Sequence, residues 1–197
     1  MAIDFTIPES VTQLTQMTQF IAESTMRPFS RELDENEHQR PEAFVEQMWP
    51  ILSSMQKSTL DKLREAESAN GSSNGGTKVK KRSNTYLRMM MLVEMLSWGD
   101  AGIYLCLPSA ALGGSAIEAV GTTEQKLRLL TRFAEGDKPV WGAMAMTEPG
   151  AGSDTSAIQT TAVFDEAANE WILNGEKIFC TSGGLALEES NGLVIAG

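Results

Sequence analysis

The spacing of hydrophobic residues changes near residue 137, and this change restricts the chain to a fold in which helices precede strands. Before that point apolar residues recur every three or four positions, which is the period of an amphipathic helix. After it they alternate or form short runs, as in Val140–Met146, Gln159–Phe164 and Trp171–Leu173. We therefore expect an α+β fold, with a helical domain over residues 1–136 and a partial β-domain over 137–197.

Two helices are predicted in the first third of the chain. The first spans Val11–Leu33, with Ser10 as its N-cap. The second starts near Pro41, a residue tolerated in the first helical turn, although Pro50 favours a kink or an end. Its residues expected to pack in a core are Phe44, Val45, Met48, Ile51, Leu52 and Met55.

Three further helices are predicted before residue 137. Thr85–Trp98 is apolar on most sides, which indicates a helix buried at the centre of a bundle, and its methionines are interpreted as core filling rather than as metal ligands. Leu107–Val120 is rich in small residues, and Thr123–Glu135 ends at Gly136. A bundle of four or five helices therefore comes before the strands.

Several connections can also be predicted. Glu67–Asn84 combines Gly, Ser and Asn with a basic run, which indicates a mobile loop. The basic run could attract the phosphates of a CoA-like ligand, but a solvated loop is the favoured interpretation. Turns are expected at Asp165–Asn169 and at Asn174-Gly175, where an Asn-Gly pair favours a type I′ hairpin. Leu193–Ala196 has the pattern of a strand.

Composition excludes several classes of protein. A formal net charge of −10 would repel a phosphate backbone, so nucleic acid is not an expected partner. Cys106 and Cys180 lie far apart in apolar surroundings, which indicates neither a disulfide framework nor a metal site. Because no apolar run approaches the roughly 18 residues that a bilayer requires, and Met1–Pro8 lacks a signal-peptide pattern, we expect a cytoplasmic protein without a membrane span.

The segment Met144–Asp154, with the sequence MAMTEPGAGSD, is the most informative one in the chain. Gly150 and Gly152 lack Cβ atoms, so the backbone there can approach a flat ring or a phosphate, and Pro149 stiffens the turn. The alternative is a glycine turn that merely joins two strands. The segment lacks the third glycine of a dinucleotide-binding fingerprint and the Gly-Lys-Ser/Thr of a P-loop, which disfavours nicotinamide and nucleoside-triphosphate enzymes.

Three motifs resemble those of one family, and they occur in the same order. Thr147–Asp154, with the sequence TEPGAGSD, resembles the signature of the acyl-CoA dehydrogenases. Gly121–Lys126 resembles the GTEEQK helix start that precedes that signature, and Asn174–Ser182 resembles the NGxKxWITN hairpin that follows it. The resemblance implies a helical N-terminal domain followed by a β-barrel-like domain, with FAD bound between the latter and a C-terminal helical domain that is absent here.

The resemblance also implies the positions of the FAD contacts. Met144, Met146 and Thr147 would line the isoalloxazine, while Gly152 and Ser153 would approach the FAD phosphates, and Ser153 would also contact the CoA ester. Phe179 takes the place where the family usually has a tryptophan, with Cys180 and Thr181 beside it and Thr181 near flavin N5. Read without the family, Phe179 would be a core residue of a strand and Thr181 a strand former.

The family oxidises a saturated acyl-CoA to the trans-2-enoyl-CoA in fatty acid β-oxidation, and a glutamate of the C-terminal domain removes the α-proton. The resemblance therefore implies that this chain holds no catalytic residue, and Glu148 does not inherit that role. We expect a fragment of a homotetrameric enzyme that passes electrons to an electron-transfer flavoprotein. The alternatives are a flavin-contacting subunit completed by a C-terminal chain, an oxidase on the same scaffold, and an interaction module without flavin.

Overall fold

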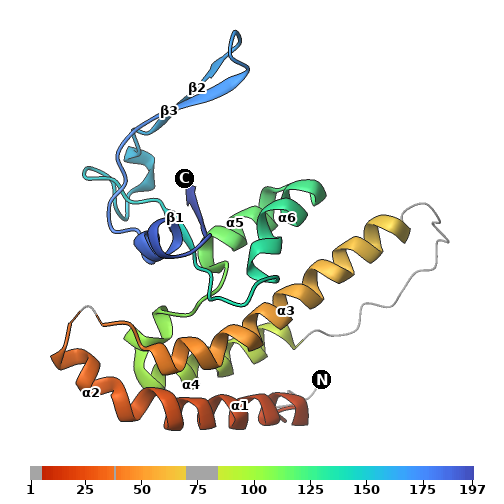
Figure 1. Cartoon of the computed structure of the whole chain (residues 1–197), viewed down its shortest axis with the longest axis vertical. Helices are drawn as coiled ribbons and strands as arrows, with labels where there is room; N and C mark the ends of the chain where they lie inside the picture. The colour runs from red at the N-terminus through yellow and green to blue at the C-terminus, as the bar shows by residue number, and fades with distance from the viewer. Residues whose placement is uncertain (1–5, 38, 70–83) are drawn as a thin grey trace, which may run out of the picture. The chain divides into compact units, whose positions relative to one another are not determined.

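The computed structural model describes residues 6–37, 39–69 and 84–197 (Figure 1). The chain divides into two compact units, one comprising residues 1–51 and 65–107 and the other residues 52–64 and 108–197. The second unit therefore combines helices with all four strands that the structure describes. The boundary between residues 136 and 137, proposed from the sequence, stays a prediction.

The first unit consists of helices whose apolar sides face one another. Their bounds are α1 Glu9–Ile21, a π-helical segment Ala22–Met26, α2 Arg27–Glu35, the start of α3 Glu42–Ala69, and α4 Thr85–Leu105. A Cβ added to Gly99 of α4 would lie 2.9 Å from both Ala22 Cβ and Met26 Sδ. This close approach fixes α4 against the N-terminal helices, around a core that includes Val11, Phe44 and Leu96.

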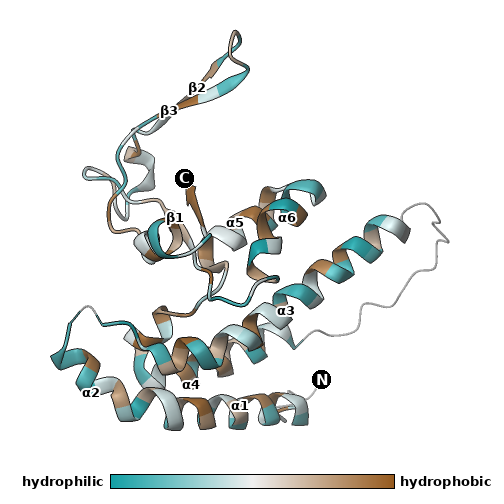
Figure 2. Cartoon of the chain, viewed as in Figure 1, coloured by the Kyte–Doolittle hydropathy of each residue, from teal (hydrophilic) through white to brown (hydrophobic). Residues whose placement is uncertain are grey.

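Two expectations about helix ends are wrong. Ser10 does not cap the first helix, because α1 begins at Glu9 and Pro8 holds the N-cap position with the extended ψ of 141°. Pro50 does not end the second helix, because α3 continues through it (Figure 2). A proline inside a helix costs about 3 kcal/mol, and burial of apolar residues on both sides of it, such as Phe44 and Leu60, offsets that cost.

Two expectations about burial are also wrong. Met55, predicted to lie in the core, is 60% exposed. The helix α4, predicted to be buried on most sides, buries only Leu96, Gly99 and Ile103 among its residues, while Tyr86 is 82% exposed. An apolar helix is covered only where neighbours contact it, and within the first unit α4 is contacted by α1, the π-helical segment and α2.

The helix α4 contains one irregular residue that has a local explanation. Asp100 leaves the helical conformation, with φ −175° and ψ 121°, and its Oδ1 accepts a hydrogen bond of 2.8 Å from the backbone N–H of Ile103. Its other carboxylate oxygen accepts a hydrogen bond from the Ser30 hydroxyl. Asp100 therefore acts as an internal N-cap for the last turn of α4 and ties that turn to α2.

The second unit packs helices against a short parallel sheet. Its elements, besides residues 52–64 of α3, are α5 Ala111–Val120, α6 Thr123–Leu130 with a 3-10 turn Thr131–Phe133, β1 Gly142–Ala145, a 3-10 turn Thr155–Ala157, β2 Thr161–Asp165, β3 Glu170–Asn174, a π-helical segment Leu185–Glu189 and β4 Leu193–Ala196. β1 pairs in parallel with β4, with Gly142 opposite Leu193. The core beneath this sheet includes Phe133, Trp141 and Ala143.

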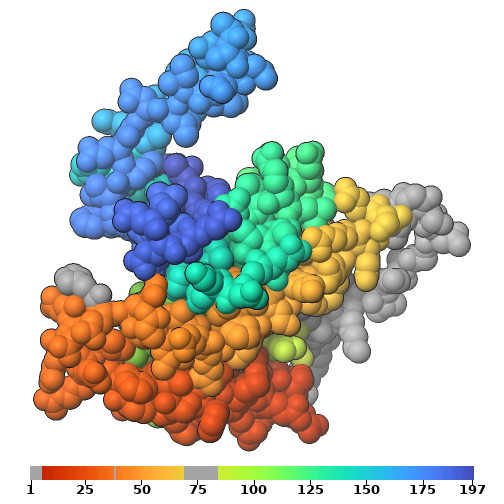
Figure 3. All heavy atoms as spheres, viewed as in Figure 1, coloured from red at the N-terminus to blue at the C-terminus, as the bar shows by residue number. Residues whose placement is uncertain are grey.

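The antiparallel pair of β2 and β3 forms a hairpin that extends from the rest of its unit (Figure 3). The predicted hairpin turn at Asn174-Gly175 is wrong, because Asn174 ends β3 opposite Thr161. The other predicted turn, Asp165–Asn169, is confirmed, because the hairpin turns at residues 166–169. There the Asp165 carboxylate accepts hydrogen bonds from two following backbone N–H groups. Gly175 is required for a different reason, since a Cβ would lie 2.2 Å from Thr160 Oγ1.

The expected fold class is confirmed, since helices precede a small number of strands in the predicted order. Most of the predicted loop 67–84 lies outside the described residues. Among the helices that the structure describes, none combines the length and the apolar character that crossing a bilayer requires.

Candidate functional site

The backbone leaves β1 and turns back on itself within four residues. Glu148 N donates to Ala151 O over 2.9 Å, and Ala151 N donates to Glu148 O over 3.1 Å, which closes the turn in both directions. A Cβ added at Gly150 or Gly152 would meet no protein atom within 4 Å. The glycines are therefore not required by packing within the described residues, and the open space beside them allows a ligand to approach the backbone.

Asp154, the last residue of the signature, has a structural role. Its Oδ1 accepts hydrogen bonds from the backbone N–H and the hydroxyl of Ser156, over 3.1 and 2.6 Å. These bonds cap the 3-10 turn Thr155–Ala157 and lower the pKa of the Asp154 carboxyl below its usual value. Asp154 thus directs the chain from the signature turn towards β2.

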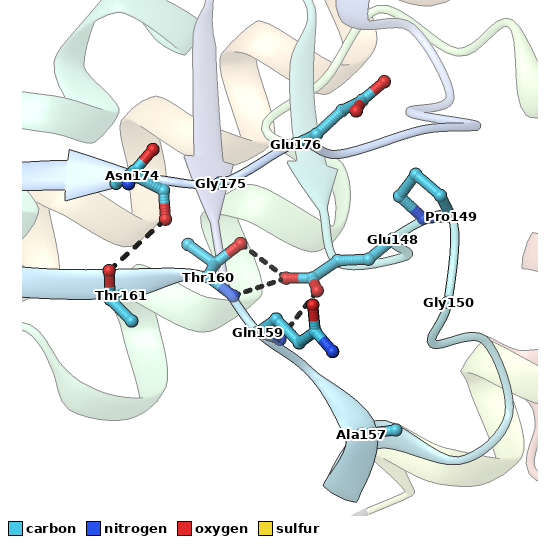
Figure 4. A pocket seen from close by; sticks show the side chains of 10 residues that line it. All are labelled: Glu148, Pro149, Gly150, Ala157, Gln159, Thr160, Thr161, Asn174, Gly175 and Glu176. Atoms are coloured by element: carbon cyan, nitrogen blue, oxygen red, sulfur yellow. Dashed lines mark hydrogen bonds between the residues drawn. The ribbon is translucent and has the colours of Figure 1, made fainter.

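Glu148 and Lys177 form a buried ion pair beside the turn. Their side chains are only 7% and 11% exposed, and Lys177 Nζ lies 2.8 Å from Glu148 Oε1. The same carboxylate accepts hydrogen bonds from the backbone N–H groups of Gln159, over 2.7 Å, and Thr160, over 3.0 Å (Figure 4). The Thr160 hydroxyl donates a further hydrogen bond to it. Every charge in this pair is therefore matched by a partner.

The same contacts determine the ionisation of Glu148. The ammonium group of Lys177, followed by the hydroxyl of Thr160 and the backbone N–H of Gln159, lowers the pKa of Glu148 from 4.5 to about 2. A carboxylate that holds its charge this firmly does not take up a proton near neutral pH. The expectation that Glu148 is not the catalytic base agrees with this environment.

The segment after β3 lies against the turn through three hydrogen bonds. Ile178 N donates to Thr147 O over 2.8 Å, and Lys177 Nζ donates to Met146 O over 3.1 Å in addition to its bond with Glu148. The signature Thr147–Asp154, which precedes the hairpin, and the motif Asn174–Ser182, which follows it, therefore meet at one place. The meeting point joins Met146 and Thr147 to the residues that follow Lys177.

Phe179 is placed unlike a core residue. Its side chain is 87% exposed, and its φ of 55° lies in the left-handed region, which a bulky residue rarely adopts. Ser182 has a similar φ of 60°. The interpretation of Phe179 as part of a strand core is wrong, because residues 175–180 form no strand. Strained backbone and an exposed ring together are features found at ligand-binding positions.

The eight residues predicted as cofactor contacts fall into two groups. Met144, Met146, Thr147 and Cys180 are half-buried, whereas Gly152, Ser153, Phe179 and Thr181 are exposed. The structure brings Met146 and Thr147 together with the segment that carries Phe179 and Thr181. Ser153 has no hydrogen bond to that segment within the described residues, so its placement beside the same ligand stays a prediction.

A cavity of about 370 Å³ has Glu148 in its lining (Figure 4). It is lined by the signature turn and the base of the hairpin, namely Glu148, Pro149, Gly150, Ala157, Gln159, Thr160, Thr161, Asn174, Gly175 and Glu176. None of the eight predicted contacts lines this cavity. The lining also lacks an aromatic or methionine side chain, so the position of the predicted ring contacts stays a prediction.

Sequence reasoning missed the role of three residues at this site. Glu148 and Lys177 occur inside recognised motifs, and their opposite charges could have suggested a pair, although Asp154 and Glu176 are further charged residues of the same motifs. Thr160 offers no comparable signal. Its contact with Glu148 depends on how the chain returns after the 3-10 turn, which the spacing of residues does not reveal.

Comparisons with known proteins agree on one family. The sequence model of the acyl-CoA dehydrogenase middle domain matches residues 143–187. The chain is 32% identical over 186 residues to acryloyl-CoA reductase (NADH) of Anaerotignum propionicum, an alignment that covers 93% of this chain and 42% of that protein.

Solved structures give the same result. Butyryl-CoA dehydrogenase of Megasphaera elsdenii matches with a TM-score of 0.67 and 25% identity, over 93% of this chain and 44% of that one. A structure described as an electron transferring flavoprotein of Acidaminococcus fermentans matches with a TM-score of 0.67 and 31% identity, over 93% and 43%. The chain thus spans less than half the length of these relatives.

Proposed function

We propose that this chain belongs to the acyl-CoA dehydrogenase family and that the complete protein is an FAD-dependent oxidoreductase acting on acyl-CoA thioesters. One observation supports this most strongly. The signature turn and the segment after β3 meet through Ile178 N and Thr147 O at 2.8 Å, although they come from separate motifs. That junction unites the two sets of residues that the family uses for its flavin.

The residues at and beside the junction offer chemical groups of the kinds that bind a flavin. Open space lies beside Gly150 and Gly152, and Phe179 exposes an aromatic face. The hydroxyls of Thr147, Ser153 and Thr181 have no hydrogen-bond partner among the described residues, so each is available to a ligand. Bound FAD would accept the hydride equivalent that leaves the β-carbon of the acyl chain.

We assign the following roles to residues of this chain. Thr147 donates to the pyrimidine edge of the ring, Met144 and Met146 cover one part of it, and Phe179 covers another. Thr181 and Cys180 lie near N5, and Gly152 and Ser153 approach the phosphates, with Ser153 also near the CoA ester. Glu148 is not assigned the role of the base that takes the α-proton, because it is held in an ion pair with Lys177 and its pKa is about 2.

The proposal includes partners and the direction of the reaction. An electron-transfer flavoprotein is the proposed redox partner, in keeping with the similarity to a structure described by that name. The similarity to an acryloyl-CoA reductase favours a second candidate, in which the same site reduces a 2-enoyl-CoA. A cytoplasmic homo-oligomer, with Cys106 and Cys180 as free thiols, completes the proposal.

A visible absorption spectrum of the full-length protein tests the proposed function. We expect a flavin spectrum that bleaches when saturated acyl-CoAs of increasing length are added without oxygen. Addition of the 2-enoyl-CoA to the dithionite-reduced protein should restore the flavin colour if the reductase direction dominates. Oxygen consumption with peroxide release would identify an oxidase instead. A protein that stays colourless after FAD is added would contradict the proposal.

A further inference from the structure

We propose that Lys177, paired with Glu148, is a positioning residue that sets the distance between the two parts of the flavin site. The inference rests on the proposed function, because it concerns the placement of Thr147 relative to Phe179 and Thr181. Neither Lys177 nor Glu148 is among the residues expected to contact the cofactor. Their effect would be transmitted through the backbone that they hold.

The ion pair joins three segments that lie apart in the sequence. Lys177 Nζ contacts Glu148 Oε1 at 2.8 Å and Met146 O at 3.1 Å, which attaches the segment after β3 to the end of β1. Glu148 in turn holds the start of β2 through Gln159 and Thr160. Lys177 is thus the single side chain, among the described residues, that binds both the signature carboxylate and the backbone preceding it.

The segment that Lys177 holds has few other attachments. Residues 175–180 belong to no strand or helix, and besides the bonds of Lys177 the hydrogen bond from Ile178 N to Thr147 O is what links them to the turn. Phe179 lies two residues beyond Lys177, so the backbone between them spans at most about 7 Å. A displacement of the Lys177 backbone would therefore act on the short stretch of chain that carries Phe179.

The burial of the pair makes it a restrictive contact. The Lys177 and Glu148 side chains are 11% and 7% exposed, so water cannot readily replace either partner. The Glu148 carboxylate accepts hydrogen bonds from Lys177, from two backbone N–H groups and from the Thr160 hydroxyl. The orientation of the carboxylate is therefore fixed by four donors at once. A binding site is held in its productive geometry by supporting residues of this kind.

Four variants of the full-length protein test the inference. Lys177→Met removes the charge and keeps most of the side-chain length, Glu148→Gln keeps the volume, and the double variant removes both charges. Lys138→Met is the matched control, because Lys138 is an exposed lysine of the same unit away from the turn. Each variant is titrated with FAD after removal of bound flavin, and the visible circular dichroism of the saturated protein is recorded.

We expect Lys177→Met to weaken FAD binding by about tenfold or more and to change the dichroism of the bound flavin. Glu148→Gln should have the same effects. The fold loss of FAD affinity in the double variant should be smaller than the product of the two single fold losses, because both substitutions break the same contact. Lys138→Met should match the parent. In the flavin-free protein, hydrogen exchange at the Ile178 amide should accelerate in Lys177→Met and not in Lys138→Met.

The outcomes separate this inference from the proposed function. A parent protein that binds no flavin contradicts the proposed function. A parent that binds flavin, together with Lys177→Met and Glu148→Gln variants that lose stability but keep its FAD affinity and dichroism, overturns the inference and leaves the function intact. If Lys177→Met does not fold, Glu148→Gln decides by the same two measurements.

Discussion

At Glu148 an acidic residue inside a ligand-binding signature stabilises the fold rather than reacting. Its carboxylate is surrounded by Lys177, Gln159 and Thr160, and it stays charged at pH values far below neutral. A buried carboxylate with a full set of donors contributes to stability only while it is charged. The contribution of Glu148 is therefore a function of pH.

The first prediction concerns acid stability. The pKa of Glu148 is lowered from 4.5 to about 2 by folding, so its contribution is complete above about pH 4.5 and is lost as the pH falls towards about 2. Urea unfolding measured across this window should show a loss of stability that is smaller in Glu148→Gln. Glu166→Gln, an exposed position in the hairpin turn, serves as control. An identical pH profile in Glu148→Gln and the parent would contradict the prediction.

Part of the candidate site could be predicted from single residues. The eight-residue signature indicated the turn, and the second motif indicated the segment with Phe179 and Thr181, because both resemblances rest on consecutive residue types. The ion pair between them and the positive φ of Phe179 could not be predicted. Both depend on where the hairpin returns the chain, which is a property of the folded backbone.

Among the elements, α6 has the most clearly defined start. Thr122 Oγ1 accepts from Gln125 N over 3.2 Å, and Gln125 Oε1 accepts from Thr122 N over 2.8 Å, which forms a capping box. The sequence placed this helix at Thr123, and the structure has it begin at that residue. A helix start with a side-chain cap can be predicted because its signal is local.

The second prediction follows from this cap. Thr122→Ala should lower the free energy of unfolding by about 1 kcal/mol, because the Gln125 N–H loses its partner. Thr123→Ala, one residue into the helix, should change it by only a few tenths of a kcal/mol. Both values come from urea unfolding followed by circular dichroism. Equal effects of the two substitutions would show that the cap contributes nothing.

The contact between α5 and β1 gives the third prediction. A Cβ at Gly113 would lie 2.5 Å from the carbonyl oxygen of Ala143, so Gly113→Ala forces the helix away from the strand. The alanine would gain up to about 1 kcal/mol in helix propensity, but overpacking costs about 1–3 kcal/mol. We expect a net loss of stability in thermal unfolding. Ser115→Ala, an exposed position of the same helix, should not destabilise.

Errors at the scale of elements have a common cause. The Asn-Gly pair at 174–175 favoured a turn, but Gly175 is fixed by its contact with Thr160, and Pro50 favoured a helix end, but α3 continues. In both places packing between distant residues outweighs a local preference. The strands, in contrast, were predicted close to their observed positions, as for Leu193–Ala196, because short runs of apolar and β-branched residues are a local signal.

Across the whole chain, the exposure of the hairpin is the feature that the sequence did not indicate. Trp171 and Phe164 pack together with ring centroids 5.2 Å apart, yet Trp171 remains 65% exposed. Val163 and Leu173 are exposed to a similar extent. Alternation predicts one covered face, but no residue of the described chain covers either face of this hairpin. Large exposed apolar surfaces of this kind promote association.

The fourth prediction tests that surface. Trp171→Ser in the 197-residue chain should reduce self-association in light scattering, while the loss of the ring pair costs about 0.5–1.5 kcal/mol of local stability. Glu166→Ser, at the polar end of the same hairpin, should leave the scattering unchanged. Unaltered scattering in Trp171→Ser would indicate that association, if it occurs, uses another surface.

The exposed methionines carry a chemical consequence. Met17, Met55, Met89 and Met90 present more than half of their side chains to solvent. Peroxide converts an accessible thioether to a sulfoxide, which is polar and chiral, whereas a buried one such as Met26 is protected. Oxidative damage would therefore begin on the outer faces of the helices. In peptide mass spectrometry, the added oxygen should appear first in the peptides that contain the exposed methionines, and only later in those that contain buried ones.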